Sequence, residues 1–425
     1  MSLAKLTATG LAPIDPLSVD FGERVNLVTG DNGLGKSLIL DLAFWQLTNS
    51  WPGQEPLRPA NSAVVTSVVA GESSSGVMRT ASYSPSEQRW VWSKERPPMS
   101  ALVIYARANG GFSVWDPARN YYRDSLDPEV GEAPRAYLMS QSEVWHGLPG
   151  PRDGQSLCNG LIRDWVSWQR ERRPEFDVLA RLLQSLSPSP DEPLVAGEPR
   201  RLSPDDVRDY PTLRTSYAEI PAHLCSEAVK RVLGLAYLIA WTWTEHQNAA
   251  RLRGWSEPFR RLVVLVDEIE AHLHPRWQRT ILPSLLAAIR GLNPDSRVQL
   301  IGVTHAPLLL ASMEPEFDEE RDRLFVIDLV RDDGQVQVRL QATPFERKGD
   351  ATAWLTSDVF DLPAAVSLPA QLAREKAAKI MAPQARPTIE DYQSVDRELR
   401  AVSAPSDVFL LRWRHFGEKR GFVAE

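Results

Sequence analysis

The stretch Gly30-Asp31-Asn32-Gly33-Leu34-Gly35-Lys36-Ser37 decides how the rest of this chain is interpreted. It fits the pattern G-x-x-x-x-G-K-[ST], a loop whose backbone amides surround phosphate groups. An apolar, β-prone run at 25–29 precedes it, and a helix-prone run at 38–45 follows it. A strand, a glycine-rich loop and a helix in this order form the context that the pattern requires. The stretch therefore predicts a binding site for a nucleoside triphosphate.

The residue types of this loop match the chemistry of phosphate binding. Glycines let the backbone curl so that N–H groups point at phosphate oxygens, and the following helix offers its positive end. Lys36 would reach the β- and γ-phosphates, and the hydroxyl of Ser37 would bind Mg²⁺, which prefers oxygen ligands. We therefore expect every residue from Gly30 to Ser37 to contribute to the binding of the nucleoside triphosphate and Mg²⁺.

A second run supplies the carboxylates that such a loop needs. Residues 262–266 are continuously apolar, as in a buried parallel strand, and Asp267 and Glu268 follow directly. Ligands of open α/β sheets bind at the carboxyl ends of the strands. We expect Asp267 to hold Mg²⁺, directly or through water, and Glu268 to polarise the attacking water.

A third strand-like run, residues 298–304, ends at His305. A strand–helix–strand unit between Asp267 and His305 would bring the two residues to one edge of a parallel sheet. A histidine at that edge would hydrogen-bond the γ-phosphate or the attacking water. A structural histidine with satisfied hydrogen bonds is the alternative.

Composition narrows the class of protein. The chain has 425 residues, 43% of them hydrophobic and 24% charged, and a formal net charge of −7, which disfavours a strongly basic coat for nucleic acid. Cys158 and Cys225 are far apart and lack metal-type spacing, so we expect a reducing compartment. We find no signal-peptide core and no membrane-spanning stretch, and expect a cytoplasmic protein without a membrane partner.

The order of strand-like and helix-like runs predicts four parts of the chain. Residues 187–215, rich in proline and charge, are expected to form a loop or mobile linker. The parts are a nucleotide-binding core at 1–60 and 250–345, an antiparallel β subdomain at 61–150, a helical subdomain at 151–249, and a helical C-terminal extension at 346–425.

Three motifs together carry a resemblance to a known family. The combination of G-D-N-G-L-G-K-S, V-D-E-I-E-A-H-L-H-P-R-W-Q and V-T-H-A-P resembles ABC-class ATPases of the SMC/RecF/OLD type. Within this class it most resembles the stand-alone AAA family ATPases of bacterial anti-phage systems. Asn32 and Gly33, the run 270–275 and the switch histidine His305 match the family's motifs. The resemblance implies an α/β P-loop NTPase head, with a mixed or parallel sheet, an antiparallel β arm, a helical subdomain and a helical tail.

The resemblance also implies a homodimer in which two heads enclose two ATP molecules. Each head completes the other's site with a signature segment, for which residues 223–231 are the counterpart here. Ser226 aligns with the signature serine, whereas Ala228 stands where a glycine is expected. A glycine would let backbone amides approach the γ-phosphate, so the alanine puts full hydrolysis in doubt. Gln88 and Gln141 both stay open as the Q-loop glutamine.

What the resemblance implies for function is an ATPase that converts ATP and water to ADP and phosphate. It would act as a dimeric sensor or regulator of a separate effector, a nuclease or toxin, in anti-phage defence. A DNA-binding SMC/RecF-like repair clamp is the alternative. An OLD-like nuclease fits less well, because no D-x-D follows His305, and Asp328, Asp332 and Asp333 lie in an expected hairpin. A transporter ATPase also fits less well, because the signature segment is weak.

Two further features admit a functional interpretation beside a structural one. His272 and His274, with Glu270, would suit a metal ion, but a packed loop is favoured. Basic and aromatic residues alternate at 412–416 and continue at 419–420, which leaves nucleic acid open as a partner. A solvated amphipathic helix is favoured there.

Overall fold

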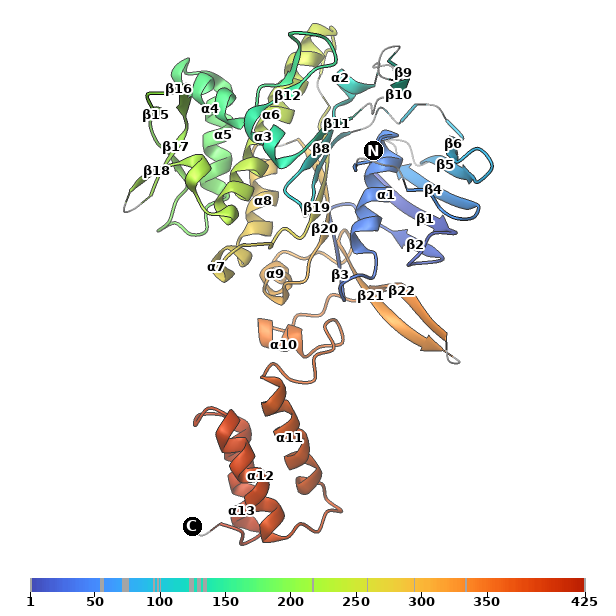
Figure 1. Cartoon of the computed structure of the whole chain (residues 1–425). Coiled ribbons are helices and arrows are strands. Elements are labelled where there is room, and N and C mark those ends of the chain that lie inside the picture. Colours follow the sequence, from blue (N-terminus) through green and yellow to red (C-terminus); the bar gives the residue numbers. More distant parts are fainter. Residues whose placement is uncertain are drawn as a thin grey trace. The chain divides into compact units, whose positions relative to one another are not determined.

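The computed structural model describes residues 2–53, 57–70, 76–94, 96–97, 99, 101–121, 126–127, 131–132, 136–215, 218–257, 259–293, 295–332 and 335–423. The chain divides into two compact units, Met1–Gly349 and Asp350–Glu425. The first unit combines strands and helices, whereas the described elements of the second are helices (Figure 1).

A mixed sheet forms the centre of the first unit. Its described strands lie in the order β11-β8-β7-β19-β20-β3-β21-β22, and the five from β7 to β21 in this order run parallel. The antiparallel strands β8, β11 and β22 complete its two sides. The bounds are β3 (Val25–Gly30), β7 (Leu102–Ala106), β8 (Phe112–Trp115), β11 (Tyr137–Met139), β19 (Arg261–Asp267), β20 (Arg297–Val303), β21 (Arg323–Asp332) and β22 (Gln335–Thr343). The α/β head with a mixed sheet, expected from the sequence, is confirmed.

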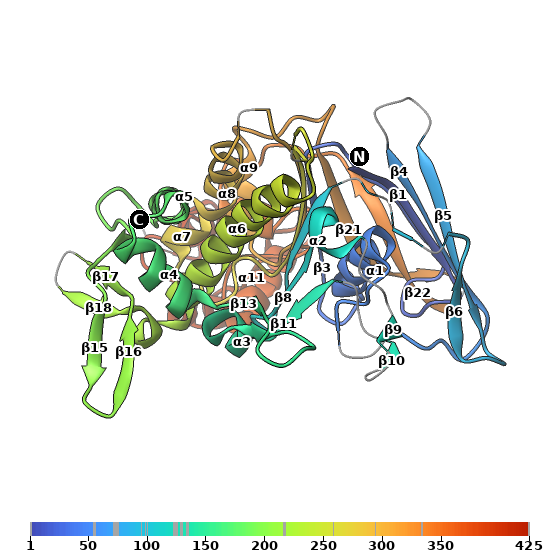
Figure 2. The same ribbon diagram turned by 90° about the horizontal axis from the view of Figure 1, so that it is seen from above.

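A second sheet forms the antiparallel arm, which is also confirmed. Its described strands lie in the order β2-β1-β4-β5-β6, with bounds β1 (Ser2–Thr9), β2 (Leu17–Asp20), β4 (Ala63–Ala70), β5 (Val77–Ser84) and β6 (Arg89–Trp92). Helix α1 (Lys36–Thr48) lies between the two sheets, as Figure 2 shows. Almost every side chain of α1 beyond its first turn is buried, because both sheets cover it.

Helices cover the opposite face of the mixed sheet, where α6 packs on β7 and α8 on β20 (Figure 2). Both faces of β19 and β20 are therefore buried, as their continuous apolar runs require. Besides α1, the described helices of the first unit are α2 (Pro117–Asn120), α3 (Gln141–His146), α4 (Leu161–Arg170), α5 (Pro174–Ser185), α6 (Glu227–Leu252), α7 (Pro275–Gln278), α8 (Ile281–Arg290) and α9 (Pro307–Met313), with a 3₁₀ turn at Ala222–Leu224.

Two expectations from the sequence need correction. Residues 61–150 do not form one antiparallel subdomain, because β7 pairs in parallel with β19, and β8 and β11 extend the same sheet. Residues 187–215 are not a plain loop, because they contain β14 (Val195–Ala196), β15 (Arg200–Ser203), β16 (Asp206–Tyr210) and β17 (Thr212–Arg214). Strands this short give no readable hydrophobic period.

The remaining small strands complete local hairpins and one three-stranded sheet. They are β9 (Leu126–Asp127) with β10 (Gly131–Glu132), β12 (Leu148–Pro149) with β13 (Ser156–Cys158), and β18 (Glu219–Pro221), which pairs with β17. Asp328 and Asp332 lie on β21, and Asp333 lies outside the described residues.

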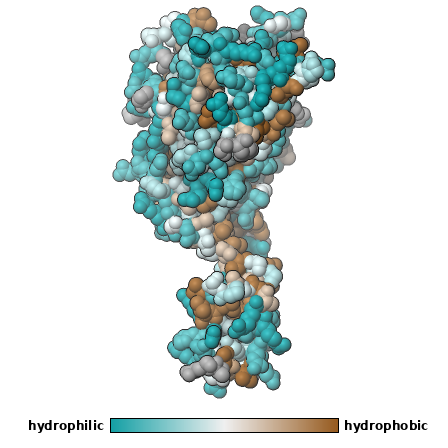
Figure 3. All heavy atoms as spheres, turned by 90° about the vertical axis from the view of Figure 1, so that its left-hand side faces the viewer, coloured by the Kyte–Doolittle hydropathy of each residue, from teal (hydrophilic) through white to brown (hydrophobic). Residues whose placement is uncertain are grey.

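The second unit contains α10 (Ala351–Leu355), α11 (Leu368–Met381), α12 (Ile389–Val402) and α13 (Val408–Lys419). Its small core centres on Trp413, whose ring stacks on Tyr392 with 4.5 Å between ring centroids. Large apolar side chains also reach its surface, and Figure 3 shows brown, hydrophobic atoms there. They include Leu368, Leu372, Val408 and Leu411. The helical C-terminal region expected from the sequence is confirmed.

A search of the described helices for membrane spans finds no segment that is both long enough and apolar enough to cross a bilayer.

Candidate functional site

The loop between β3 and α1 requires its glycines for steric reasons. Gly30, Gly33 and Gly35 have φ values of 136°, 81° and 92°, a region that other residues avoid. A Cβ atom on Gly30 would lie 2.1 Å from the carbonyl oxygen of Ile327, and one on Gly35 would lie 2.8 Å from Pro13 Cγ. Nothing lies within 4 Å of the same position on Gly33, so that side of the loop is open.

The loop holds its lysine side chain against its own backbone. Lys36 Nζ donates hydrogen bonds to the carbonyl oxygens of Gly30 at 2.9 Å and Asp31 at 2.5 Å. Burial lowers the pKa of Lys36, and the charge of Glu268 opposes this effect. The other loop residues divide by exposure, with Asp31, Asn32, Gly33 and Ser37 exposed and Leu34 buried.

The carboxylate of Asp267 lies at the end of β19, where one of its oxygens has no partner. Asp267 is 4% exposed, and its Oδ1 atom is buried without a hydrogen bond to any described group. Burial raises the pKa of this carboxyl, and the hydroxyl of Ser37 partly offsets the rise. A buried, unsatisfied carboxylate oxygen beside a hydroxyl is a donor set that suits a hard cation such as Mg²⁺.

Glu268 and His305 follow neighbouring strands and face each other. The distance between His305 Nε2 and Glu268 Oε1 is 3.7 Å, and both side chains are partly exposed. Burial and the charge of Lys36 lower the pKa of His305, which favours the neutral form of its ring, and the charge of Glu268 opposes this effect. The structure thus brings Lys36, Asp267, Glu268 and His305 to one edge of the sheet, as the strand order predicts.

Glu270 fixes the backbone at the histidine. Its buried Oε1 accepts a hydrogen bond from the amide of His305 at 2.6 Å. Burial raises the pKa of Glu270, and the amide of His305 opposes the rise. The sequence marked Glu270 as part of a family motif and beside a possible metal site, but not as the partner of His305, because a contact across 35 positions leaves no local signal.

Arg231 connects α6 to the same edge of the sheet. Its Nη2 atom donates to the carbonyl oxygens of Asp267 at 2.7 Å and Glu268 at 2.9 Å, and its Nη1 atom donates to Ala108 at 3.0 Å. Burial lowers the pKa of Arg231, and the charge of Glu268 opposes this effect. The sequence placed Arg231 at the end of the segment 223–231 without giving it a role of its own, although a basic side chain at the start of an apolar helix was a visible signal.

Asp41 is a further acidic group that sequence analysis missed. It lies one turn after Ser37 on α1, and its Oδ1 atom accepts a hydrogen bond from the hydroxyl of Tyr105 at 2.9 Å. Burial raises its pKa from 3.8 to about 6, and the charge of Asp267 adds to the rise. The signal in the sequence was an aspartate between Leu40 and Leu42, within an apolar helix.

The pKa of Asp41 predicts a pH-dependent stability. A carboxyl whose pKa is raised by folding stabilises the fold when protonated, and this stability is lost as pH rises from 3.8 towards about 6. The free energy of unfolding of the wild type should therefore fall by about 3 kcal/mol over this pH range, and Asp41→Asn should not show this fall. Urea unfolding of the nucleotide-free protein from about pH 3.5 to pH 8 measures this, with Asp20→Asn, at an exposed position, as control. Parallel pH profiles for Asp41→Asn and wild type would contradict the assignment.

Ser226 and the two glutamine candidates lie elsewhere. Ser226 is the exposed N-cap of α6, and its hydroxyl accepts the amide of Val229 at 3.4 Å. Gln141 begins α3 and lies 3.5 Å from Glu227, whereas Gln88 lies in the turn between β5 and β6. Neither glutamine directly follows β7, the strand beside β19, so the structure does not select a Q-loop residue.

His274 and two residues of the basic tail have structural roles, whereas His272 is exposed. His274 caps α7, where its Nδ1 atom accepts the amide of Arg276 at 3.3 Å. No group of three or more metal-binding side chains occurs among the described residues. In the tail, Trp413 is buried and Arg414 pairs with Glu418.

Comparison with known proteins finds short matches to two curated relatives. The chain is 43% identical over 54 residues to the Retron Vc95 probable ATPase of Vibrio cholerae serotype O1 biovar El Tor, which is 13% of this chain and 9% of that protein. It is 33% identical over 100 residues to the Septu protein PtuA of Bacillus mycoides (strain KBAB4), which is 24% of this chain and 12% of that protein. The chain thus matches about a tenth of either relative's length.

Solved SMC heads are among the structural neighbours. The SMC head domain from Thermotoga maritima has a TM-score of 0.37 and 17% identity, covering 80% of this chain and 98% of that one. The SmcHead bound to the C-winged helix domain of ScpA has a TM-score of 0.43 and 14% identity, with the same coverage.

A family model covers most of the first unit. It matches residues 25–311, more than half of the chain, and this range includes the loop, Asp267, Glu268 and His305. Its description is "AAA domain, putative AbiEii toxin, Type IV TA system". The chain belongs to this AAA domain family, and over a short stretch it is similar to the probable ATPase of a retron.

Proposed function

We propose that this protein binds ATP with Mg²⁺, hydrolyses it to ADP and phosphate, and acts as a homodimer that regulates a separate effector in the cytoplasm. The observation that carries this proposal is the convergence of four side chains at one sheet edge. Asp267 ends β19, Glu268 and His305 follow β19 and β20, and Lys36 begins α1 after the loop that follows β3. All four thus lie at the carboxyl ends of parallel strands, where ligands of α/β sheets bind.

Lys36, Glu268 and His305 have separate roles in the proposed hydrolysis. On ATP binding, Lys36 Nζ exchanges its two carbonyl partners for phosphate oxygens, so the loop needs no large rearrangement. Glu268 accepts the proton of the attacking water, and its partial exposure leaves room for that water. The neutral ring of His305 offers one N–H donor to the γ-phosphate or the water, and Glu270 holds its backbone in place.

The proposed cation ligands are Ser37 and Asp267. The unsatisfied Oδ1 atom of Asp267 gives this assignment its structural support. Bound there, Mg²⁺ would neutralise charge on the phosphates.

The dimer is proposed because Ser226 lies on an exposed helix start that does not serve its own loop. The first amides of α6, a 26-residue helix, carry the positive end of the helix dipole, which attracts phosphate. A second copy would present these amides to the γ-phosphate. Ala228 stays compatible with this role, but its Cβ limits how closely a phosphate approaches.

In the closed dimer, Arg231 would connect the start of α6 to the end of β19, where the cation ligand Asp267 lies. It is five positions from Ser226 and donates to the carbonyl groups of Asp267 and Glu268. A displacement of the start of α6 therefore moves the backbone of Asp267 and Glu268. In the reverse direction, a change in the bound nucleotide moves α6.

The effector is proposed to be a nuclease or toxin in anti-phage defence. The short matches to the Retron Vc95 probable ATPase and to the Septu protein PtuA support this context. A DNA clamp is the alternative, and nucleic acid stays open as a second partner. Co-purification with the Glu268→Gln variant in ATP would separate the two, since an effector gives a protein band and a clamp retains duplex DNA.

Complementation between two inactive subunits tests the shared site. Lys36→Ala should disable the subunit's own loop, and Ser226→Arg should disable the site that it completes in the partner. Each variant alone should lack ATPase activity, and an equimolar mixture should recover about a quarter of the wild-type rate, because half of the dimers contain one intact site. Ser86→Arg, on an exposed turn, is the charge-matched control. A mixture no more active than its components would contradict a shared site.

A further inference from the structure

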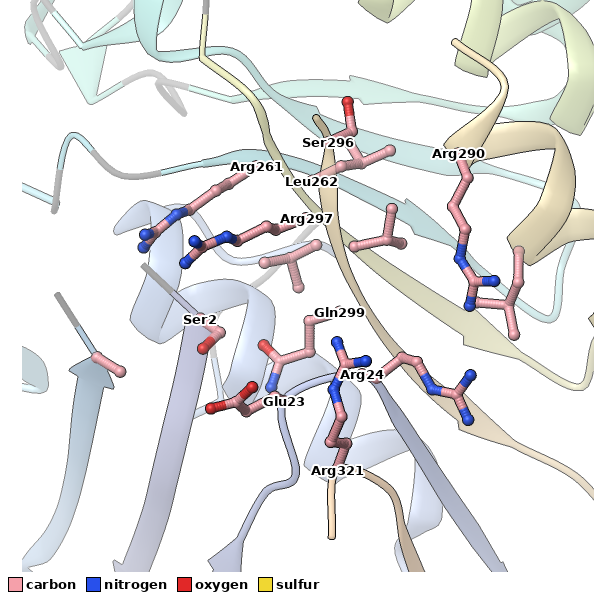
Figure 4. Close-up of a pocket in the computed structure, with 14 residues that line it drawn as sticks. Ser2, Glu23, Arg24, Arg261, Leu262, Arg290, Ser296, Arg297, Gln299 and Arg321 are labelled. Atoms are coloured by element: carbon pink, nitrogen blue, oxygen red, sulfur yellow. The ribbon is translucent and has the colours of Figure 1, made fainter. Parts of the chain in front are cut away.

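A cavity of about 580 Å³ opens at the amino ends of β19 and β20, the edge of the sheet opposite to the nucleotide site (Figure 4). Five arginines line it, and they come from separate parts of the first unit. They are Arg24, Arg261, Arg290, Arg297 and Arg321. The chain as a whole carries a net charge of −7, so this concentration of cations is a local feature.

Two of these arginines occupy neighbouring positions on parallel strands. Arg261 begins β19 and is the register partner of Arg297, which begins β20. Adjacent strands lie about 4.8 Å apart, and like charges placed opposite each other in a sheet destabilise it. Burial lowers the pKa of Arg261, and the charge of Arg297 lowers it further. Figure 4 shows the two side chains extending side by side, with Arg321 entering the cavity from another side.

Acidic groups offset only part of this charge. Asp322 forms an ion pair with Arg24, and Glu23 is the one described carboxylate that lines the cavity. In the part of the chain that the structure describes, Arg290, Arg297 and Arg321 form no ion pair with a carboxylate. The cavity therefore holds three arginines that have no carboxylate counter-ion among the described residues.

The arginine side chains that line the cavity indicate which class of ligand it binds. The planar guanidinium group presents parallel N–H donors that match phosphate oxygens, and the cavity volume lies within the usual range for small-molecule sites. We propose that this cavity binds a small organic polyphosphate, a ligand with two or more phosphoryl groups that is distinct from the ATP at the loop. Glu23 and Ser2 supply acceptors for hydroxyl groups of the same ligand.

The test uses the full chain with Lys36→Ala, so that the loop does not take up the probe. The probe is inorganic tripolyphosphate, measured by isothermal titration calorimetry at low salt. We expect micromolar binding, and a loss of about tenfold for each of Arg297→Gln and Arg321→Gln. Both side chains are exposed, and unfolding temperatures of the variants check that the fold is kept. The matched controls are Arg386→Gln and Arg397→Gln, exposed arginines of the second unit, which should leave the affinity unchanged.

Two outcomes would overturn the proposal. One is an affinity for tripolyphosphate that is absent or does not respond to Arg297→Gln, Arg321→Gln or Arg290→Gln. The other is binding of a 20-nucleotide single strand or duplex that needs these arginines and that tripolyphosphate does not displace, which would assign the cavity to nucleic acid.

Discussion

Replacing Glu268 with glutamine lowers the rate of ATP hydrolysis by about 100-fold or more and leaves ATP binding intact. The amide keeps the shape of the side chain but does not accept the proton of the attacking water. The backbone of Glu268 is held independently, since its amide donates to Val303 at 3.1 Å and its carbonyl oxygen accepts from Arg231. Phosphate release under saturating ATP and Mg²⁺ measures the rate, and retention of labelled ATP on the protein measures binding.

The control for this variant is Glu320→Gln, which makes the same chemical change at an exposed position. Its rate should equal that of the wild type. Turnover by Glu268→Gln within twofold of the wild-type rate would mean that another group accepts the proton.

Replacing Lys36 with alanine weakens ATP binding by about 100-fold or more, equivalent to about 3 kcal/mol. The variant loses the one ammonium group that the loop directs at the phosphates, and no other lysine lies within the described loop. Its fold should persist, because Lys36 Nζ bonds only to carbonyl oxygens of its own loop. Fluorescence titration with a labelled ATP analogue measures the affinity.

Lys5→Ala serves as the control, because Lys5 is an exposed lysine that pairs with Asp20 on the antiparallel arm. An affinity of the Lys36→Ala protein equal to that of wild type would remove the phosphate-loop assignment and the ATPase function with it.

Local sequence predicts those parts of the site that are continuous in the chain. The loop at 30–37 specifies its own conformation through glycines, and the apolar run 262–266 needs a covered strand whatever its neighbours are. Asp267, Glu268 and His305 directly follow such strands. Parallel strands place their carboxyl ends at one edge, so the sequence already implies that these residues meet.

Contacts between distant segments could not be predicted in the same way. Arg231 and Glu270 act on backbone groups 35 to 37 positions away, and the Tyr105–Asp41 bond spans 64 positions. None of these pairs produces a periodic pattern. The strand β7 did carry a signal in the sequence, because the run L-V-I-Y-A of Leu102–Ala106 is apolar or aromatic throughout, and the structure buries all of it. A continuous apolar run favours a central parallel strand over an antiparallel arm.

The mass of the Glu268→Gln protein in solution tests the central claim, which is that two chains close around ATP. With ATP and Mg²⁺, we predict a species of twice the 47.6 kDa of one chain by light scattering, which ADP does not produce. Lys36→Ala should give no such ATP-dependent species. A Glu268→Gln protein that binds one ATP per chain and keeps the same mass in ATP and ADP would contradict the account.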